Sequence, residues 1–229
     1  MGGDRRIRMD PAERKEQVLA VAAKVFAEKG YRAANVTDIV TRAGIGRGTF
    51  YLYFNSKQDV FLAIVEKYFS DLVFILAENR KCLDAEIRDG GRALGTWRGN
   101  ILRILEYHRD NPDMTSIIYR DALGSDEHFA SRVAELNAIA NRQLLEEFRS
   151  LEKTGVLREC NLELVVTIIM GSLINVIMQH IVGGEGLALE YVIDELMQYH
   201  VRALVRSDGE IARALSEATA GPKAKKRRA

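Results

Sequence analysis

Proline is scarce in this sequence: three occur in 229 residues, at positions 11, 112 and 222. Because proline removes a backbone donor and kinks or ends a helix, the long proline-free stretches favour helical structure. Cysteine is also scarce. Cys82 and Cys160 form no CxxC pair and have no histidine at metal-ligand spacing. We therefore expect two buried small apolar residues in a reduced protein, with no disulfide framework, no metal site and no cofactor.

Long apolar runs are equally few. The N-terminal sequence MGGDRRIRMDP has basic residues but no apolar stretch behind them, so we expect no signal peptide and a cytoplasmic protein. One run, residues 164–184, has no Asp, Glu, Lys or Arg and is long enough to span a bilayer. It includes Ser172, Asn175 and Gln179, and no second such run accompanies it. We interpret it as a helix buried in the core and against a partner subunit rather than in a membrane.

Charge is distributed unevenly along the chain. Residues 1–57 contain 11 Lys and Arg against 6 Asp and Glu, whereas residues 58–222 contain 17 against 26. The last seven residues, KAKKRRA, add five basic side chains. A basic N-terminal part beside an acidic body indicates that the N-terminal part meets a polyanion. The alternative, a solvated charged face, explains the C-terminal tail more readily than the N-terminal excess.

Apolar periodicity and helix-end signals predict an all-α fold of about nine helices, with no strand. Asp10 and Pro11 open a helix that ends at Lys29-Gly30. Thr37 is expected to cap a second, short helix that Gly44 stops. A third short helix is expected from Arg47 to about Phe54. The predicted boundaries of the following helices are a capping box at Ser56–Asp59, a stop at Asn111-Pro112, a stop at Gly155, a cap at Asn161 and a break at Gly183-Gly184.

The stretch AGIGRGTFYLYF, residues 43–54, has three alternate glycines followed by four aromatics. A Walker-type phosphate loop needs a lysine and Ser/Thr after the last glycine, and a dinucleotide-binding loop needs a preceding strand. A hairpin also needs a strand before the turn. Because a helix is expected before this run, the remaining interpretation is a helix-turn-helix, whose second helix enters the DNA major groove.

The aromatics of this run divide by helical position. Phe50 and Phe54, four residues apart, are expected to face inward. Tyr51 and Tyr53 are expected to face outward, where a hydroxyl reaches phosphate or a ring touches a thymine methyl. One core face and one contact face therefore account for the aromatic cluster.

The segment VLAVAAKVFAEKGYRAANVTDIVTRAGIGRGTFYLYFNSK, residues 18–57, resembles the DNA-binding domain of TetR/AcrR-type bacterial transcriptional regulators. The marks are AxxxFxxKGY at the end of the first helix and the run VTDIVxRAGIGRGTFYxYFxSK. The resemblance covers about a quarter of the chain strongly, and the remainder matches in architecture alone. It implies an all-helical homodimer with an N-terminal domain that binds a palindromic operator in double-stranded DNA. It also implies a larger helical domain for dimerisation and for a small-molecule effector, and repression as the usual mode.

The resemblance assigns DNA contacts by position. It implies phosphate contacts at Thr37, Thr49, Tyr53 and Lys57. It implies base contacts at Arg47 and Gly48, the first residues of the recognition helix, and a base-methyl or phosphate contact at Tyr51. Arg47 is the first long donor of the recognition helix, and contact with a guanine or with a phosphate both remain open. Arg5, Arg6 and Arg8 suit a minor-groove arm or a solvated tail.

The larger domain is expected to span residues 58–206, after a DNA-binding domain of residues 1–57 and before an extension of residues 207–229 with a basic tail. Two helices, at roughly residues 162–182 and 187–206, resemble the family's dimer bundle. Effector contacts are expected from polar or aromatic residues on otherwise apolar faces, where a satisfied buried group or a dimer hydrogen bond is the alternative. They are Trp97, Tyr107, Tyr119, Asn137, Asn141, Asn175 and Gln179. Their mainly aliphatic surroundings indicate a hydrophobic or amphipathic effector.

Catalysis has little support in the sequence. His108-Arg109-Asp110 spells a kinase catalytic-loop triplet, but no glycine-rich strand loop or DFG accompanies it. The histidines show no HExxH and no ligand spacing. We therefore predict that the chain is not an enzyme. A helical interaction module without DNA binding would explain the core but not the basic and tyrosine residues of the turn. A steep fall of affinity with salt distinguishes the two alternatives.

Overall fold

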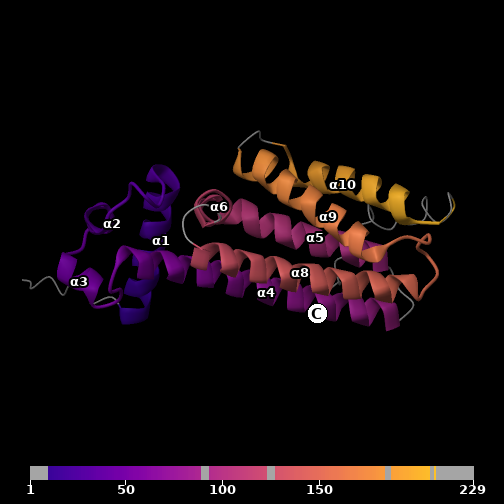
Figure 1. Ribbon diagram of the computed structural model, residues 1–229, viewed down its shortest axis with the longest axis horizontal. Helices are drawn as coiled ribbons and strands as arrows, with labels where there is room; N and C mark the ends of the chain where they lie inside the picture. The colour runs from indigo at the N-terminus through magenta and orange to yellow at the C-terminus, as the bar shows by residue number, and fades with distance from the viewer. Residues whose placement is uncertain (1–9, 89–92, 123–126, 184–186, 207–208, 210–229) are drawn as a thin grey trace, which may run out of the picture. The chain divides into compact units, whose positions relative to one another are not determined.

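The computed structural model describes residues 10–88, 93–122, 127–183, 187–206 and 209. Over these ranges the protein is helical, with nine α-helices and two π-helical turns (Figure 1). The one β-type contact in the described ranges is an isolated antiparallel bridge between Leu157 and Val205. The predicted all-α fold with about nine helices is confirmed.

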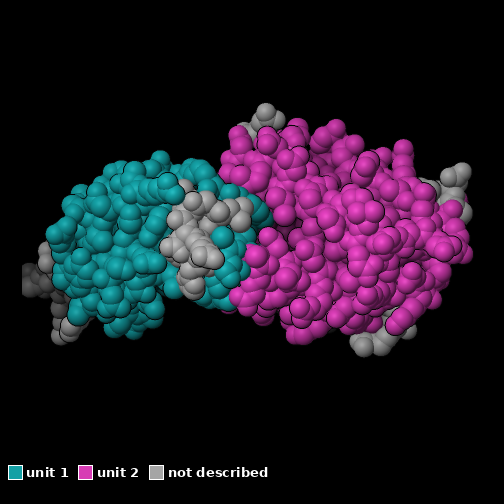
Figure 2. Space-filling view, viewed as in Figure 1, with its two compact units in different colours: residues 1–69, 113–133 teal, residues 70–112, 134–229 magenta. Residues whose placement is uncertain are grey.

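The chain divides into two compact units (Figure 2). Unit 1 combines residues 1–69 with residues 113–133, and unit 2 combines residues 70–112 with residues 134–229. Helices α4 (Lys57–Arg88) and α8 (Glu127–Glu152) contribute residues to both. Nothing in the sequence indicated that residues 113–133 join the N-terminal unit. The predicted functional domains, 1–57 and 58–206, stay a prediction, and the expected tail lies outside the described residues apart from Gly209.

Helix α1 (Pro11–Lys29) begins and ends where the sequence predicts. Asp10 Oδ1 accepts a hydrogen bond from the backbone amide of Ala12 at 2.8 Å, and Pro11 occupies the first helical position. The helix ends at Gly30, whose φ of 78° suits a residue without a Cβ. Its buried face consists of Val18, Leu19, Ala22, Ala23, Val25 and Phe26.

Helix α2 (Val36–Ala43) is capped by Asn35, so the prediction that Thr37 caps it is wrong. Asn35 Oδ1 accepts from the amide of Asp38, and Asp38 Oδ2 accepts from the amide of Asn35, both at 3.0 Å. This reciprocal pair satisfies two backbone donors, whereas a threonine hydroxyl would satisfy one. Thr37 is the second residue of the helix and is exposed.

Helix α4 opens with the predicted Ser56–Asp59 pair, in a modified form. Ser56 Oγ accepts from the amide of Asp59 at 3.0 Å, but the Asp59 carboxylate accepts from the amide of Asn55 at 2.8 Å. The start of the helix is therefore tied to two preceding residues. Residues of its first turns, Val60, Phe61, Ile64, Val65 and Tyr68, are buried in unit 1.

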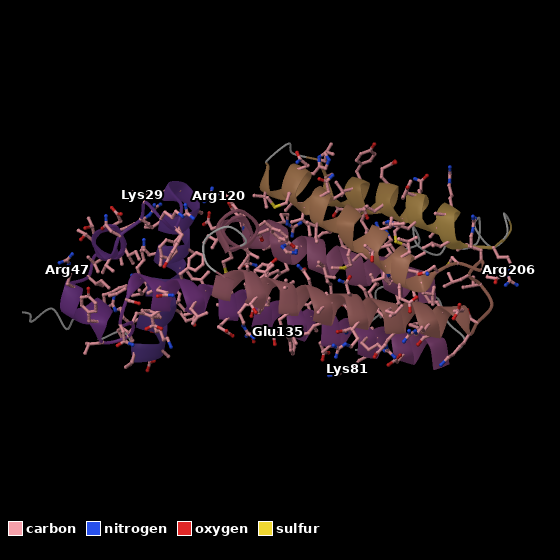
Figure 3. The ribbon with its side chains drawn as sticks, in the orientation of Figure 1. Lys29, Arg47, Lys81, Arg120, Glu135 and Arg206 are labelled. Atoms are coloured by element: carbon pink, nitrogen blue, oxygen red, sulfur yellow. The ribbon has the colours of Figure 1, made fainter. Side chains whose placement is uncertain are left out.

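Unit 1 also contains the short helix α6 (Pro112–Ser116) and the π-helical turn η1 (Ile117–Ala122). Arg120 Nη2 donates to the main-chain carbonyls of Phe26 at 3.1 Å and Ala27 at 2.9 Å. These carbonyls lie in the last turn of α1, and that of Phe26 also accepts from the amide of Gly30 at 2.8 Å. The side chain of Arg120 therefore joins η1 to the end of α1, and Figure 3 labels it.

Unit 2 is built from the later turns of α4, α5 (Ala93–Asp110), most of α8, α9 (Leu162–Val176), the π-helical turn η2 (Ile177–Val182) and α10 (Leu189–Leu204). The side-chain amide of Asn79 donates to the carbonyl of Asn100 at 3.1 Å, and Asn100 donates to the carbonyl of Asn79 at 3.2 Å. Arg103 donates to both amide oxygens, at 2.8 and 2.6 Å. Since Asn79 and Asn100 are 1% and 3% exposed, these bonds satisfy polar groups that water does not reach.

One face of α9 is apolar and exposed. Leu164 and Ile168 are 59% and 51% exposed, and Gly171, Asn175 and Gln179 continue the exposed positions at helical spacing. Among the described helices, the segment Leu162–Val182 alone is long and apolar enough to cross a membrane, and 22% of its most apolar stretch is buried. The protein's own core therefore covers only part of the helix that the sequence predicts to be buried.

The prediction that both cysteines are buried is wrong for Cys82, which is exposed on α4, and Cys160 is half-buried. Cys82 follows exposed Lys81 and precedes Leu83, which is fully buried. The helix turn places Leu83, not Cys82, on the inner face.

Candidate nucleic-acid interface and effector site

Two glycines shape the turn between α2 and α3 (Arg47–Tyr51). Gly44 ends α2 in the left-handed conformation, with φ 64° and ψ 34°, and its amide donates to the carbonyls of Thr41 and Val40. Gly46 is extended and precedes α3 directly. A side chain at Gly44 would be strained by that φ. The predicted tight turn between two short helices is therefore observed.

The aromatic residues around α3 face the two directions predicted for them. Phe50 and Phe54 are 0% and 2% exposed, and their rings lie 5.9 Å apart. Tyr51 is 52% exposed and Tyr53 is half-buried. Leu52, which the sequence analysis did not single out, is 79% exposed. The exposed side of α3 and its C-cap thus carries a tyrosine and a leucine that do not pack in the core.

Arg47, which Figure 3 labels, lies at the start of α3 and is exposed. Its Nη2 donates to Thr37 Oγ1 at 2.8 Å, so the first residue of α3 is hydrogen-bonded to the first turn of α2. Thr49 is half-buried, and nothing lies within 4 Å of where a Cβ on Gly48 would be. This open space permits a close approach of another molecule to the backbone at Gly48.

Two other basic residues of the unit are paired with carboxylates. Lys29 Nζ lies 2.6 Å from Asp38 Oδ1, and Arg42 contacts Glu28. The hydrogen bond from Lys29, with that from the Asn35 amide, lowers the pKa of Asp38, and the bond from Arg42 lowers the pKa of Glu28. Arg47 has no carboxylate partner among the ion pairs of the described residues. The charge of Arg47 is therefore less neutralised than the charges of Lys29 and Arg42.

Lys57, the seventh predicted DNA contact, is engaged within unit 1. Its Nζ donates to the carbonyls of Tyr31 and Ala34, both at 2.8 Å, and to that of Arg32 at 3.3 Å. The ring centroid of Tyr31 lies 4.5 Å from the same nitrogen. The side chain thus points to the turn between α1 and α2.

The seven predicted effector residues are divided between the two units. Tyr119 belongs to unit 1 and the other six to unit 2. Tyr107 donates to Asp71 at 3.2 Å, and burial together with the Asp71 charge raises the pKa of its hydroxyl. The remaining polar candidates lie at or near the surface: Asn137 is half-buried, and Asn141, Asn175 and Gln179 are exposed.

Trp97 is the candidate at the centre of unit 2. Its ring packs against Phe148 with centroids 5.4 Å apart and against His200 at 6.0 Å. Trp97 is 2% exposed, and its buried Nε1 has no hydrogen-bond partner among the described residues. An unmet buried donor costs about 1 to 3 kcal/mol. An acceptor that reached this nitrogen would recover that energy.

His200 and Ser172 border this tryptophan, and sequence reasoning did not select His200. Ser172 Oγ lies 3.2 Å from His200 Nε2 and 2.8 Å from the carbonyl of Ile169. Burial lowers the pKa of His200, which favours the neutral ring. Its spacing of four residues from Leu196 on the inner face of α10 was the available signal.

Comparison with known proteins identifies the N-terminal unit. Residues 18–64 match the family model for bacterial regulatory proteins of the tetR family. This segment of the chain is a tetR-family domain. The match contains the whole of α2, the glycine turn, α3 and the start of α4. The chain therefore carries a helix-turn-helix DNA-binding domain, as its sequence predicts.

A curated relative is the transcriptional activator FasR of Mycolicibacterium smegmatis, 38% identical over 73 residues. That stretch is 31% of this chain and 33% of FasR, so the likeness is confined to about a third of the relative's length. The relatives are named as regulators of transcription, in agreement with the prediction that the chain is not an enzyme.

Solved structures share the fold over most of the chain. A TetR/AcrR-type regulator from Aquifex aeolicus has a TM-score of 0.64 at 23% identity and covers 81% of this chain and 96% of its own. A complex of SmeT with triclosan has a TM-score of 0.66 at 20% identity and covers 86% and 94%. SmeT is described as the repressor of a Stenotrophomonas maltophilia multidrug efflux pump. At these identities the likeness establishes the fold.

Proposed function

We propose that the protein is a cytoplasmic, ligand-responsive transcriptional regulator that binds a palindromic operator as a homodimer. The observation that carries this proposal is the α2–turn–α3 element, with a buried aromatic face and an exposed face around Arg47 and Tyr51. The residues proposed to contact DNA are Thr37, Arg47, Gly48, Thr49, Tyr51 and Tyr53. Arg47 reads a base edge, and the threonines and Tyr53 contact phosphates.

The proposed dimer uses the exposed face of α9 together with α10. Tyr191 and Tyr199 of α10 are 55% and 67% exposed, and Leu164 and Ile168 of α9 are exposed to a similar degree. Apolar surface on a long helix favours burial against a second copy. Asn175 of α9 and Gln179 of η2 continue that exposed face and would form hydrogen bonds across the interface. A two-fold axis then relates two recognition helices by one helical turn of DNA, about 34 to 36 Å.

The proposed effector is a small hydrophobic or amphipathic molecule bound in unit 2. The unmet donor of Trp97 and the neutral ring of His200 support an uncharged ligand with a hydrogen-bond acceptor, such as a carbonyl or ether oxygen. SmeT, a protein of the same fold, is known in complex with triclosan. Binding shifts the population toward a state in which α4 moves and the two recognition helices no longer match the half-site spacing.

Repression is the proposed direction of regulation, because an operator-bound dimer blocks a promoter without a further partner. SmeT is a repressor, whereas FasR is an activator. The two directions are separated by placing a reporter behind the operator. Repression predicts higher expression when the gene for this protein is deleted, and activation predicts lower expression.

The experiment that tests the proposal is a gel shift and footprint of the purified full chain on DNA upstream of its own gene, with a random-sequence duplex for comparison. A protected palindrome, and an affinity that falls steeply with salt, are expected. Equal binding to both duplexes at every salt concentration would contradict operator recognition. Once an operator is known, candidate effectors are screened by the loss of the shifted band.

A further inference from the structure

The ammonium of Lys57 has no unused donor. Lys57 is the first residue of α4, and three main-chain carbonyl oxygens surround its Nζ, at 2.8 Å (Tyr31), 2.8 Å (Ala34) and 3.3 Å (Arg32). An ammonium carries three N–H donors, so these acceptors occupy all of them. A phosphate would therefore have to replace a carbonyl, and that carbonyl would lose its charged partner.

The electrostatic setting of Lys57 favours this internal arrangement. A cation at the first position of a helix is opposed by the positive end of the helix dipole. The three carbonyls follow Gly30, the C-terminal cap of α1, and therefore lie at the negative end of the α1 dipole. The face of the Tyr31 ring adds a cation–π contact at 4.5 Å. Each of these groups attracts the ammonium toward the turn.

The turn that Lys57 holds determines where α2 begins. Residues 31–34 connect the end of α1 to Asn35, the N-cap of α2. The ring of Tyr31 also packs 4.3 Å from that of Phe61 on α4. Since α3 lies between α2 and α4 in the chain, the bonds from Lys57 fix both elements that flank the recognition helix.

We propose that Lys57 is a positioning residue, which holds the turn of residues 31–34 against the start of α4, and that it does not contact DNA phosphate. The contacts within unit 1 carry this assignment, and only its effect on affinity rests on the proposed DNA binding. The assignment separates Lys57 from Arg47, whose guanidinium is exposed and bonded to one hydroxyl.

The first test uses hydrogen exchange of the full chain without DNA, in Lys57→Met, Lys57→Arg and the control Lys24→Met. Lys24 is exposed on α1, and the control removes the same charge from the same unit. We expect Lys57→Met and Lys57→Arg to raise the exchange rates of amides in residues 31–36 by at least about tenfold. The control should leave them unchanged. Unchanged exchange in both Lys57 variants would overturn the proposal.

The second test measures affinity for a random-sequence duplex of about 30 base pairs at several salt concentrations. A lost phosphate contact lowers the slope of log affinity against log salt by about 0.9 for each chain bound. We expect Lys57→Met to weaken binding by the same factor at every salt concentration, with the wild-type slope. A lower slope would overturn the proposal. So would full wild-type affinity in Lys57→Arg, because arginine replaces lysine well at a phosphate but not among three carbonyls. If the wild type binds no duplex, the proposed function fails and the exchange result still decides the role of Lys57.

Discussion

Arg47 Nη2 and Thr37 Oγ1 lie 2.8 Å apart, which joins the first residue of the recognition helix to the first turn of α2. Both side chains are exposed, so the bond orients the guanidinium without burying it. A guanidinium held in one direction loses less conformational entropy when it pairs with a base. The bond therefore suits a residue that reads DNA sequence.

Arg47→Ala is expected to weaken operator binding by about 1 to 3 kcal/mol and to relax the base preference at one position in each half-site. Competition between the operator and its single-base variants measures both effects. Thr37→Val, which removes the hydroxyl and keeps the size, should give a smaller loss with the preference retained. If Arg47→Ala weakens all duplexes equally, Arg47 contacts a phosphate.

Ile168→Glu is expected to dissociate the proposed dimer, because a carboxylate would be desolvated opposite its own copy across the two-fold axis. Sedimentation of the full chain should show a shift to the monomer mass, with the helical content retained. Phe74→Glu is the matched control, since Phe74 is 66% exposed on α4 and lies outside the proposed interface. A dimer that survives Ile168→Glu and dissociates in Phe74→Glu would move the interface to α4.

Asn79→Ala is expected to destabilise unit 2 by about 2 to 3 kcal/mol, as it leaves a buried carbonyl and a guanidinium N–H without their partners. Asn100→Ala should cost a similar amount, for the same reason. The two losses should not add fully in the double variant, because the two amide oxygens share Arg103 as their donor. Urea unfolding of the four proteins measures the coupling. Additive losses would mean that the two asparagines act separately.

The local sequence predicted the N-terminal unit more fully than the C-terminal one. Caps and turns are local, so Asp10, Gly30 and Gly44 in unit 1 could be assigned from their neighbours, as could Asn161 in unit 2. The prediction of Thr37 as the cap of α2 was wrong, since asparagine and threonine are both good N-caps and the reciprocal Asn35–Asp38 pair decided between them.

Contacts between distant parts of the chain carried no comparable signal. The three carbonyls around Lys57 come from more than 20 residues away, and those around Arg120 from more than 90. Every residue has a main-chain carbonyl, so no sequence pattern reveals which carbonyl accepts such a bond. The same holds for Trp97 and His200, which meet only because α5 and α10 pack together.

Glu147→Gln is expected to stabilise the protein at pH 8 and to change it little at pH 4. Burial raises the pKa of Glu147 from 4.5 to about 7, against a smaller lowering by Arg80. The folded chain therefore holds this proton between pH 4.5 and 7 while the unfolded chain releases it, and stability falls as pH rises through that window. The gain at pH 8 should be at most about 3 kcal/mol, measured by urea unfolding across pH. An equal effect at both pH values would indicate a packing change instead.

His108 should give the stability of the protein the opposite dependence on pH. Its burial lowers the pKa from 6.5 to about 4, so the unfolded chain takes up a proton between these values and the folded chain does not. Stability should fall as pH drops from 6.5 to 4, by at most about 3 kcal/mol. His108→Gln should flatten this acid limb in the same unfolding series. If the stability of Glu147→Gln, which keeps His108, does not change between pH 6.5 and 4, the burial of a neutral His108 would be contradicted.

Gly183→Ala tests the wide turn that ends η2. The amide of Gly183 donates to the carbonyl of Met178 at 3.1 Å, and a Cβ at Gly183 would lie 2.6 Å from the carbonyl oxygen of Gln179. Neither backbone group can move without opening the turn, so a loss of about 1 to 3 kcal/mol is expected. Gly99→Ala in α5 is the control, because nothing lies within 4 Å of its Cβ position and helix propensity favours alanine by up to about 1 kcal/mol. Unfolding midpoints should therefore shift in opposite directions. A tolerated alanine at 183 would show that η2 relaxes to ordinary α-helix there at little cost.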